Sequence, residues 1–300
     1  MTSRRVAILS AGVAALVLVV LLAIRLTPRE ERFEGRSLSS WARDLRSADS
    51  SVRTTAVRTL AGAAPRSPGA AHVLLEALAD SVADPFHGTV AEALVELGPE
   101  GRVAVPRLVT MLGDGHPRIR AQAATTLGQI AIAAEAPVLP LGRALSDPDS
   151  GVRMAAASAL GRVGAAAAPV QADLVVATSD SSSMVRLEAM RALAGLPLDT
   201  SVVLPALIRG LDDAREQVRR AAAYGVARYD GAAVAAVPAL RRALADAHYG
   251  LRTVAAEALG RIGPPAAAAI PDLNRALADT DSTTRTTVAN ALARIAGRVP

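Results

Sequence analysis

The sequence lacks cysteine and lysine altogether and holds very few aromatic residues. Without cysteine, disulfide bonds and thiolate metal sites are excluded, and the redox compartment stays undetermined. All 33 basic residues are therefore arginine, which a GC-rich coding bias explains as well as any function does. Aromatics make up 2% of the chain against 51% hydrophobic residues, so alanine, valine and leucine must build the interior. Such side chains favour thin layers of closely packed helices and leave little for a deep ligand pocket.

The formal net charge of +5 is concentrated at the amino terminus. Residues 1–32 contain five arginines and two glutamates, which gives that stretch a charge of +3 and leaves +2 for the rest of the chain. Together with the shortage of aromatics that could stack on bases, this distribution argues against a nucleic-acid partner.

Residues 6–24 form an uncharged, apolar run with arginines on both sides. Its length is close to the ~20 residues that a helix needs to cross a bilayer. We therefore expect a short tail at residues 1–5, a transmembrane signal-anchor helix at 6–24 and a polar linker at 25–36. A cleaved signal peptide is the alternative, but its apolar region is usually shorter. These features predict a single-pass membrane protein with the rest of the chain outside the cytoplasm.

A dipeptide of one apolar residue and one arginine recurs every 33 residues through most of the chain. It is found at Ile119-Arg120, Val152-Arg153, Val185-Arg186, Val218-Arg219 and Leu251-Arg252. A leucine near the end of each unit keeps the same step, as in Leu127, Leu160 and Leu193. A strict period in this range predicts stacked structural repeats, which grow by adding neighbours rather than by enlarging one core.

Each unit divides into two predicted helices. The first has a proline in its first turn, as at Pro106 and Pro205, and leucines four residues apart, such as Leu273 and Leu277, that mark a buried face. The second is typified by residues 150–163, for which Asp149 is a suitable N-cap and Gly164 a suitable C-cap. We count eight such units between residues 37 and 297, and expect the Trp41 ring to cover the exposed end of the first one.

The segments Leu/Val-Pro-x-Leu-x-x-x-Leu-x-Asp and the run Asp-x-Asp-x-x-Val-Arg-x-Ala-Ala-x-x-Ala-Leu-Gly at 147–161 carry a family resemblance. The pattern resembles HEAT repeats, in particular the bacterial group related to phycobiliprotein-lyase HEAT-like repeats. The resemblance covers residues 37–297 and implies an all-α fold, a right-handed α-solenoid of helical hairpins. It implies little about activity, because such arrays serve many functions.

An aspartate stands six residues before each repeated arginine, which places it at the turn that leads into the second helix. The carboxylate also meets a favourable helix dipole there. Because such groups can bond within and between units, we interpret them as a structural ladder rather than as catalytic residues. The members are Asp114, Arg120, Asp147, Arg153, Asp180, Arg186, Asp213, Arg219, Asp246, Arg252, Asp279 and Arg285.

The sequence shows no constellation for catalysis or metal binding. Metal-dependent HEAT proteins carry paired His-Glu dipeptides, but none of His72, His87, His116 and His248 is followed by glutamate. Glycine-rich phosphate loops, Gly-x-Ser-x-Gly and zincin patterns are missing as well. We therefore expect a non-enzymatic protein with no cofactor and no metal.

The second helices carry a variable stripe on the side that faces away from the core. In curved solenoids this layer usually lines the concave side. Arginine and tyrosine are the residue types that most often anchor interfaces. We hypothesise a recognition groove for an acidic protein segment; a solvated, arginine-biased face without a partner is an equally open interpretation. The groove residues are Arg162, Arg191, Arg220, Tyr224, Arg228, Glu257 and Arg261.

These observations favour a membrane-anchored, non-enzymatic scaffold that binds a partner segment in the concave groove of a helical array. The tether would concentrate the groove near the membrane. The alternative, which follows from the family resemblance, is an accessory of bilin-lyase type or another oxidoreductase or lyase accessory protein.

Overall fold

The computed structural model describes residues 31–80, 93, 104–130, 137–196 and 199–298. In these ranges the chain is a series of helix pairs, as the period predicts. The first helices of the pairs are α2 (Leu38–Asp44), α4 (Pro68–Asp80), α6 (Val105–Met111), α8 (Val138–Ala144), α10 (Gln171–Ala177), α12 (Thr200–Gly210), α14 (Val237–Ala243) and α16 (Ile270–Ala276). The second helices are α3 (Ser50–Ala63), α7 (Pro117–Ile130), α9 (Ser150–Val163), α11 (Ser183–Gly195), α13 (Glu216–Ala227), α15 (Tyr249–Ile262) and α17 (Ser282–Ile295).

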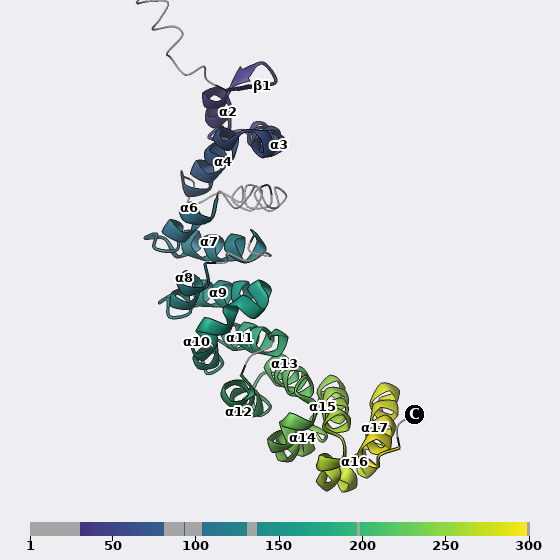
Figure 1. The fold of residues 1–300 in the computed structure, drawn as a ribbon. Helices are drawn as coiled ribbons and strands as arrows, with labels where there is room; N and C mark the ends of the chain where they lie inside the picture. Colours follow the sequence, from purple (N-terminus) through teal and green to yellow (C-terminus); the bar gives the residue numbers. More distant parts are fainter. Residues whose placement is uncertain (1–30, 81–92, 94–103, 131–136, 197–198, 299–300) are drawn as a thin grey trace, which may run out of the picture.

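The helix pairs stack into a curved α-solenoid with two layers (Figure 1). From α7 to α17 each second helix packs against the second helix of the next pair. These second helices lie on the inside of the bend, and the first helices α12, α14 and α16 lie on the outside. The second helices, which carry the stripe of residues named above, therefore form the concave layer of the array. The second helix expected in the second unit falls on residues outside the described ranges.

Helix α9 shows how the sequence of one unit specifies its local structure. The Asp149 carboxylate accepts hydrogen bonds from the amides of Gly151 (2.9 Å) and Val152 (3.1 Å), which satisfies donors that the first turn leaves open. Gly164 ends the helix with φ of 75°, a left-handed conformation that glycine adopts without strain. The predicted bounds and both predicted caps are confirmed.

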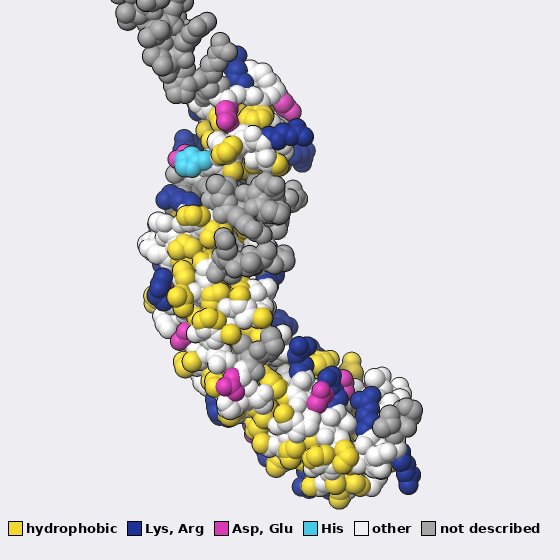
Figure 2. All heavy atoms as spheres, in the orientation of Figure 1, with side chains coloured by type: hydrophobic (Ala, Val, Ile, Leu, Met, Phe, Trp, Pro, Cys, Tyr) yellow, Lys and Arg dark blue, Asp and Glu magenta, His cyan; other side chains and the backbone are white. Residues whose placement is uncertain are grey.

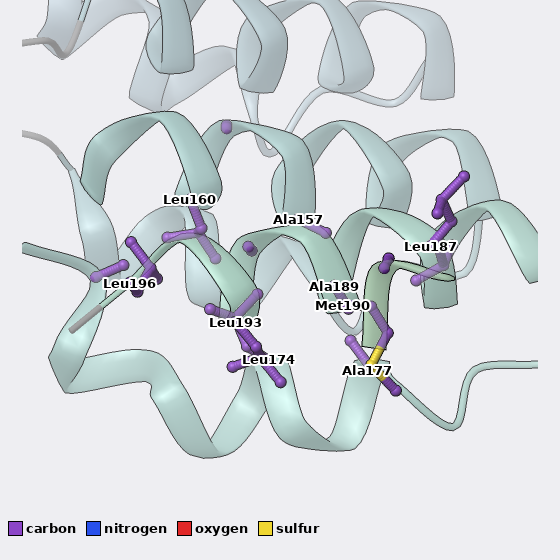
Figure 3. Close-up of a cluster of buried hydrophobic side chains, with 14 of the residues drawn as sticks. Ala157, Leu160, Leu174, Ala177, Leu187, Ala189, Met190, Leu193 and Leu196 are labelled. Atoms are coloured by element: carbon purple, nitrogen blue, oxygen red, sulfur yellow. The ribbon is translucent and has the colours of Figure 1, made fainter. Parts of the chain in front are cut away.

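The core lies between the two helix layers and consists almost entirely of leucine, valine and alanine. Figure 3 shows one segment of it, where Leu160 of α9, Leu174 of α10 and Leu193 of α11 converge with Met190. All four side chains are fully buried. Burial of each leucine contributes roughly 2 kcal/mol relative to exposure, so the stack is held together by contacts between neighbouring repeats.

Short 3-10 segments lead into several first helices; in α14 and α16 the proline lies in the first turn, whereas Pro169 lies inside the 3-10 segment before α10. These segments are η3 (Gly164–Val170), η4 (Asp230–Ala236) and η5 (Pro264–Ala269). Helix α12 departs from this pattern, because the side chain of Asp199 accepts from the amide of Ser201 and starts the helix earlier. The prediction of a first-turn proline is therefore wrong for Pro205, which lies inside α12.

The prediction of two buried leucines in the first helix of the last unit is confirmed for only one of them. Leu273 is fully buried, whereas Leu277 is 41% exposed. Leu277 follows α16 in the last unit that the structure describes, where the stack has a neighbour on one side only. A repeat at the end of a solenoid covers less of its apolar surface than an internal one.

A small β-hairpin precedes the first helix pair, which the periodic pattern did not predict. Strands β1 (Arg32–Phe33) and β2 (Arg36–Ser37) pair in antiparallel fashion. The short 3-10 segment η1 (Ala64–Arg66) is not part of this hairpin and lies between α3 and α4. The Trp41 indole donates to the Phe33 carbonyl (3.2 Å) and the Arg36 guanidinium lies over its ring (4.3 Å). Trp41 is 4% exposed, so the hairpin buries the one tryptophan of the chain. The last residues of the expected polar linker 25–36 are thus folded.

The expectation of a single-pass membrane protein needs correction. Within the ranges that the structure describes, no helix is both long enough and apolar enough to cross a membrane. The predicted span at residues 6–24, together with the tail at 1–5, lies outside the described residues. No membrane localisation is therefore assigned.

Candidate functional site

The repeated aspartates and arginines join each repeat to the next. Arg120 donates through Nε and Nη2 to the two carboxylate oxygens of Asp147, both at 2.7 Å. Its Nη1 also donates to the backbone carbonyl of Asp114 (2.9 Å), six residues earlier in its own unit. Asp147 in turn accepts from the amide of Asp149 (2.9 Å) and so shapes the turn before α9. One guanidinium and one carboxylate thus hold two successive inter-helix turns together.

This arrangement, which we call the Asp–Arg ladder, repeats with ion pairs between residues 27 apart. The aspartate six residues before each arginine is therefore not its ion-pair partner. Each arginine donates to the backbone carbonyl of that aspartate and, up to Arg252, forms its ion pair with the aspartate of the next unit. At the ends, Asp114 accepts from the amide of His116, and Arg285 donates to the carbonyl of Asp279. The remaining pairs are Arg153–Asp180, Arg186–Asp213, Arg219–Asp246 and Arg252–Asp279.

Burial and charge make the ladder a structural feature. The paired side chains are only 7% to 17% exposed. The hydrogen bonds from Arg153 hold the pKa of Asp180 below its usual value against the opposing effect of burial. For Asp213, burial is the largest influence and raises the pKa, but the hydrogen bonds from Arg186 and from the turn amide outweigh it and the net pKa is lowered. These carboxylates are ionised and accept hydrogen bonds from arginines of the preceding repeat, which favours the stacking of one repeat on the next.

A hollow of about 490 Å³ opens on the concave side, between α11, α13 and α15. Six of the seven predicted groove residues line it, and they come from three successive second helices. Figure 2 shows arginine and acidic side chains next to one another on the inner face of this part of the array. The six are Arg191, Arg220, Tyr224, Arg228, Glu257 and Arg261.

Arg162, the seventh predicted groove residue, does not line the hollow. It lies in the last turn of α9, one repeat before Arg191. The corresponding residue one repeat later is Gly195, which does line the hollow and contributes no side chain to fill it. The sequence signal for the place of the hollow is Gly195, because the equivalent position in the neighbouring repeats is an arginine (Arg162, Arg228 and Arg261). The rest of the lining is small or polar: Ala194, Gln217, Ala221 and Ala227.

Sequence reasoning missed three carboxylates that hold the groove arginines. Glu188 pairs with Arg191 (2.7 Å), Glu216 with Arg220 (3.1 Å) and Asp230 with Arg261 (2.9 Å). The first two pairs are three and four residues apart on one helix, a spacing that brings side chains together and could have been recognised. The third joins two repeats and depends on the fold.

No metal centre is evident in the part of the chain that the structure describes, where no group of three histidine or acidic side chains could hold an ion. His72 lies in α4 and pairs with Glu76 one turn later (3.2 Å), both exposed. His87 lies outside the described residues.

Comparison with known families identifies the repeats. A family model of HEAT repeats matches residues 105–194, 138–227, 172–260 and 237–299. The matches together span well over half of the 300 residues, and the chain therefore belongs to the HEAT-repeat family. Comparison with curated proteins gives no match. The finer resemblance to the phycobiliprotein-lyase group is not confirmed.

Solved structures show the same fold. An engineered protein is 24% identical with a TM-score of 0.57, over 86% of this chain and 78% of its own. Kap121p is 16% identical with a TM-score of 0.64, over 87% of this chain but only 33% of its own length. At these identities the likeness establishes the architecture, an all-α helical repeat solenoid, and nothing about the partner.

Proposed function

We propose that this HEAT-repeat chain is a non-enzymatic scaffold that binds a segment of a partner protein in the concave hollow between α11, α13 and α15. The observation that carries the proposal is the gathering of Tyr224 and four arginines around one hollow of about 490 Å³. Arginine and tyrosine are enriched among the residues that dominate binding energy in protein interfaces. A curved solenoid also offers an extended concave surface suited to such a partner.

The individual side chains have complementary roles in this proposal. Tyr224 is 52% exposed and offers a flat, rigid surface for an apolar or aromatic side chain of the partner. Arg228 lies at the end of α13 and can form a charge-assisted, bidentate hydrogen bond with a carboxylate. The alanines and Gly195 leave room for the partner backbone to approach closely. In this proposal, the partner therefore supplies one acidic side chain, which contacts Arg228.

The lining favours binding over chemistry. It contains arginine, glutamine, alanine, glycine, one tyrosine and one glutamate, and no serine, threonine or histidine. A nucleophile with an adjacent base, or a pair of carboxylates, is needed for most hydrolytic reactions. Neither arrangement is present among the lining residues.

Site-specific crosslinking in the native host tests the proposal. A photoreactive phenylalanine analogue in place of Tyr224 should give a discrete crosslinked product with a partner protein. The matched control carries the same analogue in place of Val176, which is 74% exposed on α10 in the outer layer. Equal crosslinking at both positions, or none at position 224, would contradict the proposal.

Gly195→Leu should block the hollow without harming the fold. A Cβ at Gly195 would meet no atom within 4 Å, so the leucine side chain enters open space, and leucine is favoured over glycine in a helix. We expect crosslinking from position 224 to fall by about tenfold, because the side chain occupies the space of the partner. Far-UV circular dichroism should show an unchanged or higher melting temperature.

The control for this variant is Gly62→Leu in α3, where a Cβ also meets no atom within 4 Å. It introduces the same side chain far from the hollow and should leave crosslinking unchanged. A Gly195→Leu variant that still crosslinks fully would show that the partner does not enter the hollow.

A further inference from the structure

The arginines of the hollow are mostly paired within the chain. Arg191 and Arg220 are 57% and 42% exposed, whereas their partners Glu188 and Glu216 are only 16% and 14% exposed. Each glutamate therefore lies beneath its arginine and holds the guanidinium at the surface. A guanidinium has five N–H donors, so one that is anchored by a carboxylate still presents donors to a ligand.

The third pair has the opposite arrangement. Asp230 is 62% exposed and lies at the edge of the hollow, and Arg261, at 37%, is the less exposed partner. Asp230 has a positive φ of 44°, at the position where the corresponding residue of the next repeat is Gly263. An aspartate tolerates this conformation better than most residues, but at some cost in strain. The exposed carboxylate adds negative charge at the rim.

The sum of these charges decides what kind of partner fits. The lining holds four guanidiniums and the carboxylate of Glu257, and three further carboxylates pair with the arginines. Four positive and four negative groups leave this region without net charge. A run of acidic residues would therefore find no attractive potential to offset its own desolvation.

Two charged groups of the lining remain without an ion pair among the described residues. Arg228 and Glu257 both line the hollow and both are exposed, but neither appears in a salt bridge or a side-chain hydrogen bond. They come from successive repeats, with Arg228 at the end of α13 and Glu257 within α15. They therefore offer one site for an anion and one for a cation on either side of the repeat boundary.

We infer that the hollow recognises a peptide segment of mixed charge, with one acidic side chain for Arg228 and one basic side chain for Glu257. The anchored guanidiniums of Arg191 and Arg220 donate to backbone carbonyls of the peptide, which carry no net charge. A polyacidic segment is thereby disfavoured. This inference rests on the proposed function, because it specifies the partner of the same hollow.

Selection from a library of random short peptides against the full chain tests the inference. The wild-type chain should enrich peptides with one acidic and one basic residue at a fixed separation and a net charge near zero. A labelled wild-type-selected peptide should bind Arg228→Glu and Glu257→Arg each about tenfold or more weakly, measured by fluorescence anisotropy. The double variant Arg228→Glu/Glu257→Arg should enrich peptides in which the two charges have exchanged order.

The possible outcomes separate the inference from the proposed function. Enriched peptides that are uniformly acidic, and that bind Glu257→Arg as well as or better than wild type, would overturn the inference but leave the groove as the binding site. Peptides that bind Gly195→Leu and Tyr224→Ala as tightly as wild type would overturn the proposed function as well, and so would a lack of any enrichment. Both charged positions are exposed, so circular dichroism should show the fold intact in every variant.

Discussion

Gly128→Ala is expected to lower the free energy of unfolding by about 3 kcal/mol, although alanine is the better helix former. Gly128 of α7 is buried against Ala159 of α9, and a Cβ there would lie 2.5 Å from the Cα of Ala159. Because the obstacle is backbone, no side-chain rotation can relieve the overlap. The two second helices must move apart, and the contacts between two repeats are lost with them.

The matched control is Gly62→Ala in α3, where a Cβ meets nothing within 4 Å. Relief of the glycine penalty should make this variant more stable by roughly 0.5–1 kcal/mol. Urea denaturation gives the two shifts, and native-state hydrogen exchange locates the Gly128→Ala effect in α7 and α9. Equal stability of the two variants would mean that the helices are not in close contact at this point.

The regular part of the fold could be predicted from the sequence because every repeat places a given position in the same environment. Val152 and Leu160 recur at one step of 33 residues and are both fully buried. A single well-marked unit, with Asp149 before it and Gly164 after it, was therefore enough to delimit helix α9. Period and capping chemistry carry this information without any knowledge of long-range contacts.

The irregular parts could not be predicted, since each depends on one local or one long-range contact. The hairpin at residues 32–37 exists because it covers Trp41, and nothing periodic marks it. Helix α12 starts early because Asp199 caps it, whereas α10, α14 and α16 are each preceded by an alanine-rich 3-10 segment. The choice of a ladder partner 27 residues away depends on how neighbouring repeats are offset, which a period alone does not specify.

The candidate groove was predictable as a stripe but not as a hollow. Positions one repeat apart on parallel second helices lie next to one another, which explains why residues such as Arg191, Tyr224 and Glu257 meet. The stripe alone does not indicate where the hollow lies: Gly195 lines it, whereas Arg162 does not. The carboxylates that pair with the groove arginines, for example Asp230, lie at positions outside the stripe, so the stripe alone did not predict these pairs.

Asp180→Asn should lower the free energy of unfolding at neutral pH by about 2 kcal/mol. The substitution keeps the shape of the side chain and can still accept the amide of Ser182, but it removes the charge that Arg153 contacts through two hydrogen bonds. Arg153 would then be held at 15% exposure without its counter-charge. The matched control is Asp212→Asn, whose partner Arg242 lies at the same 2.7 Å but with both side chains 59% exposed. Because exposed pairs contribute little, we expect at most about 0.5 kcal/mol for the control.

The stability difference between wild type and Asp180→Asn should also depend on pH. The folded-state pKa of Asp180 is lowered, chiefly by its hydrogen bond with Arg153, so its contribution is complete above the unfolded value of about 3.9 and is lost as pH falls through the folded value. Wild type and Asp180→Asn should therefore differ most at neutral pH and converge below about pH 4. Since Asp147, Asp213, Asp246 and Asp279 have lowered pKa values as well, the loss in wild type is cumulative over the ladder. A difference that persisted unchanged in acid would show that the ionised carboxylate is not its source, whereas convergence places the stabilisation in the ionised pair that joins successive repeats.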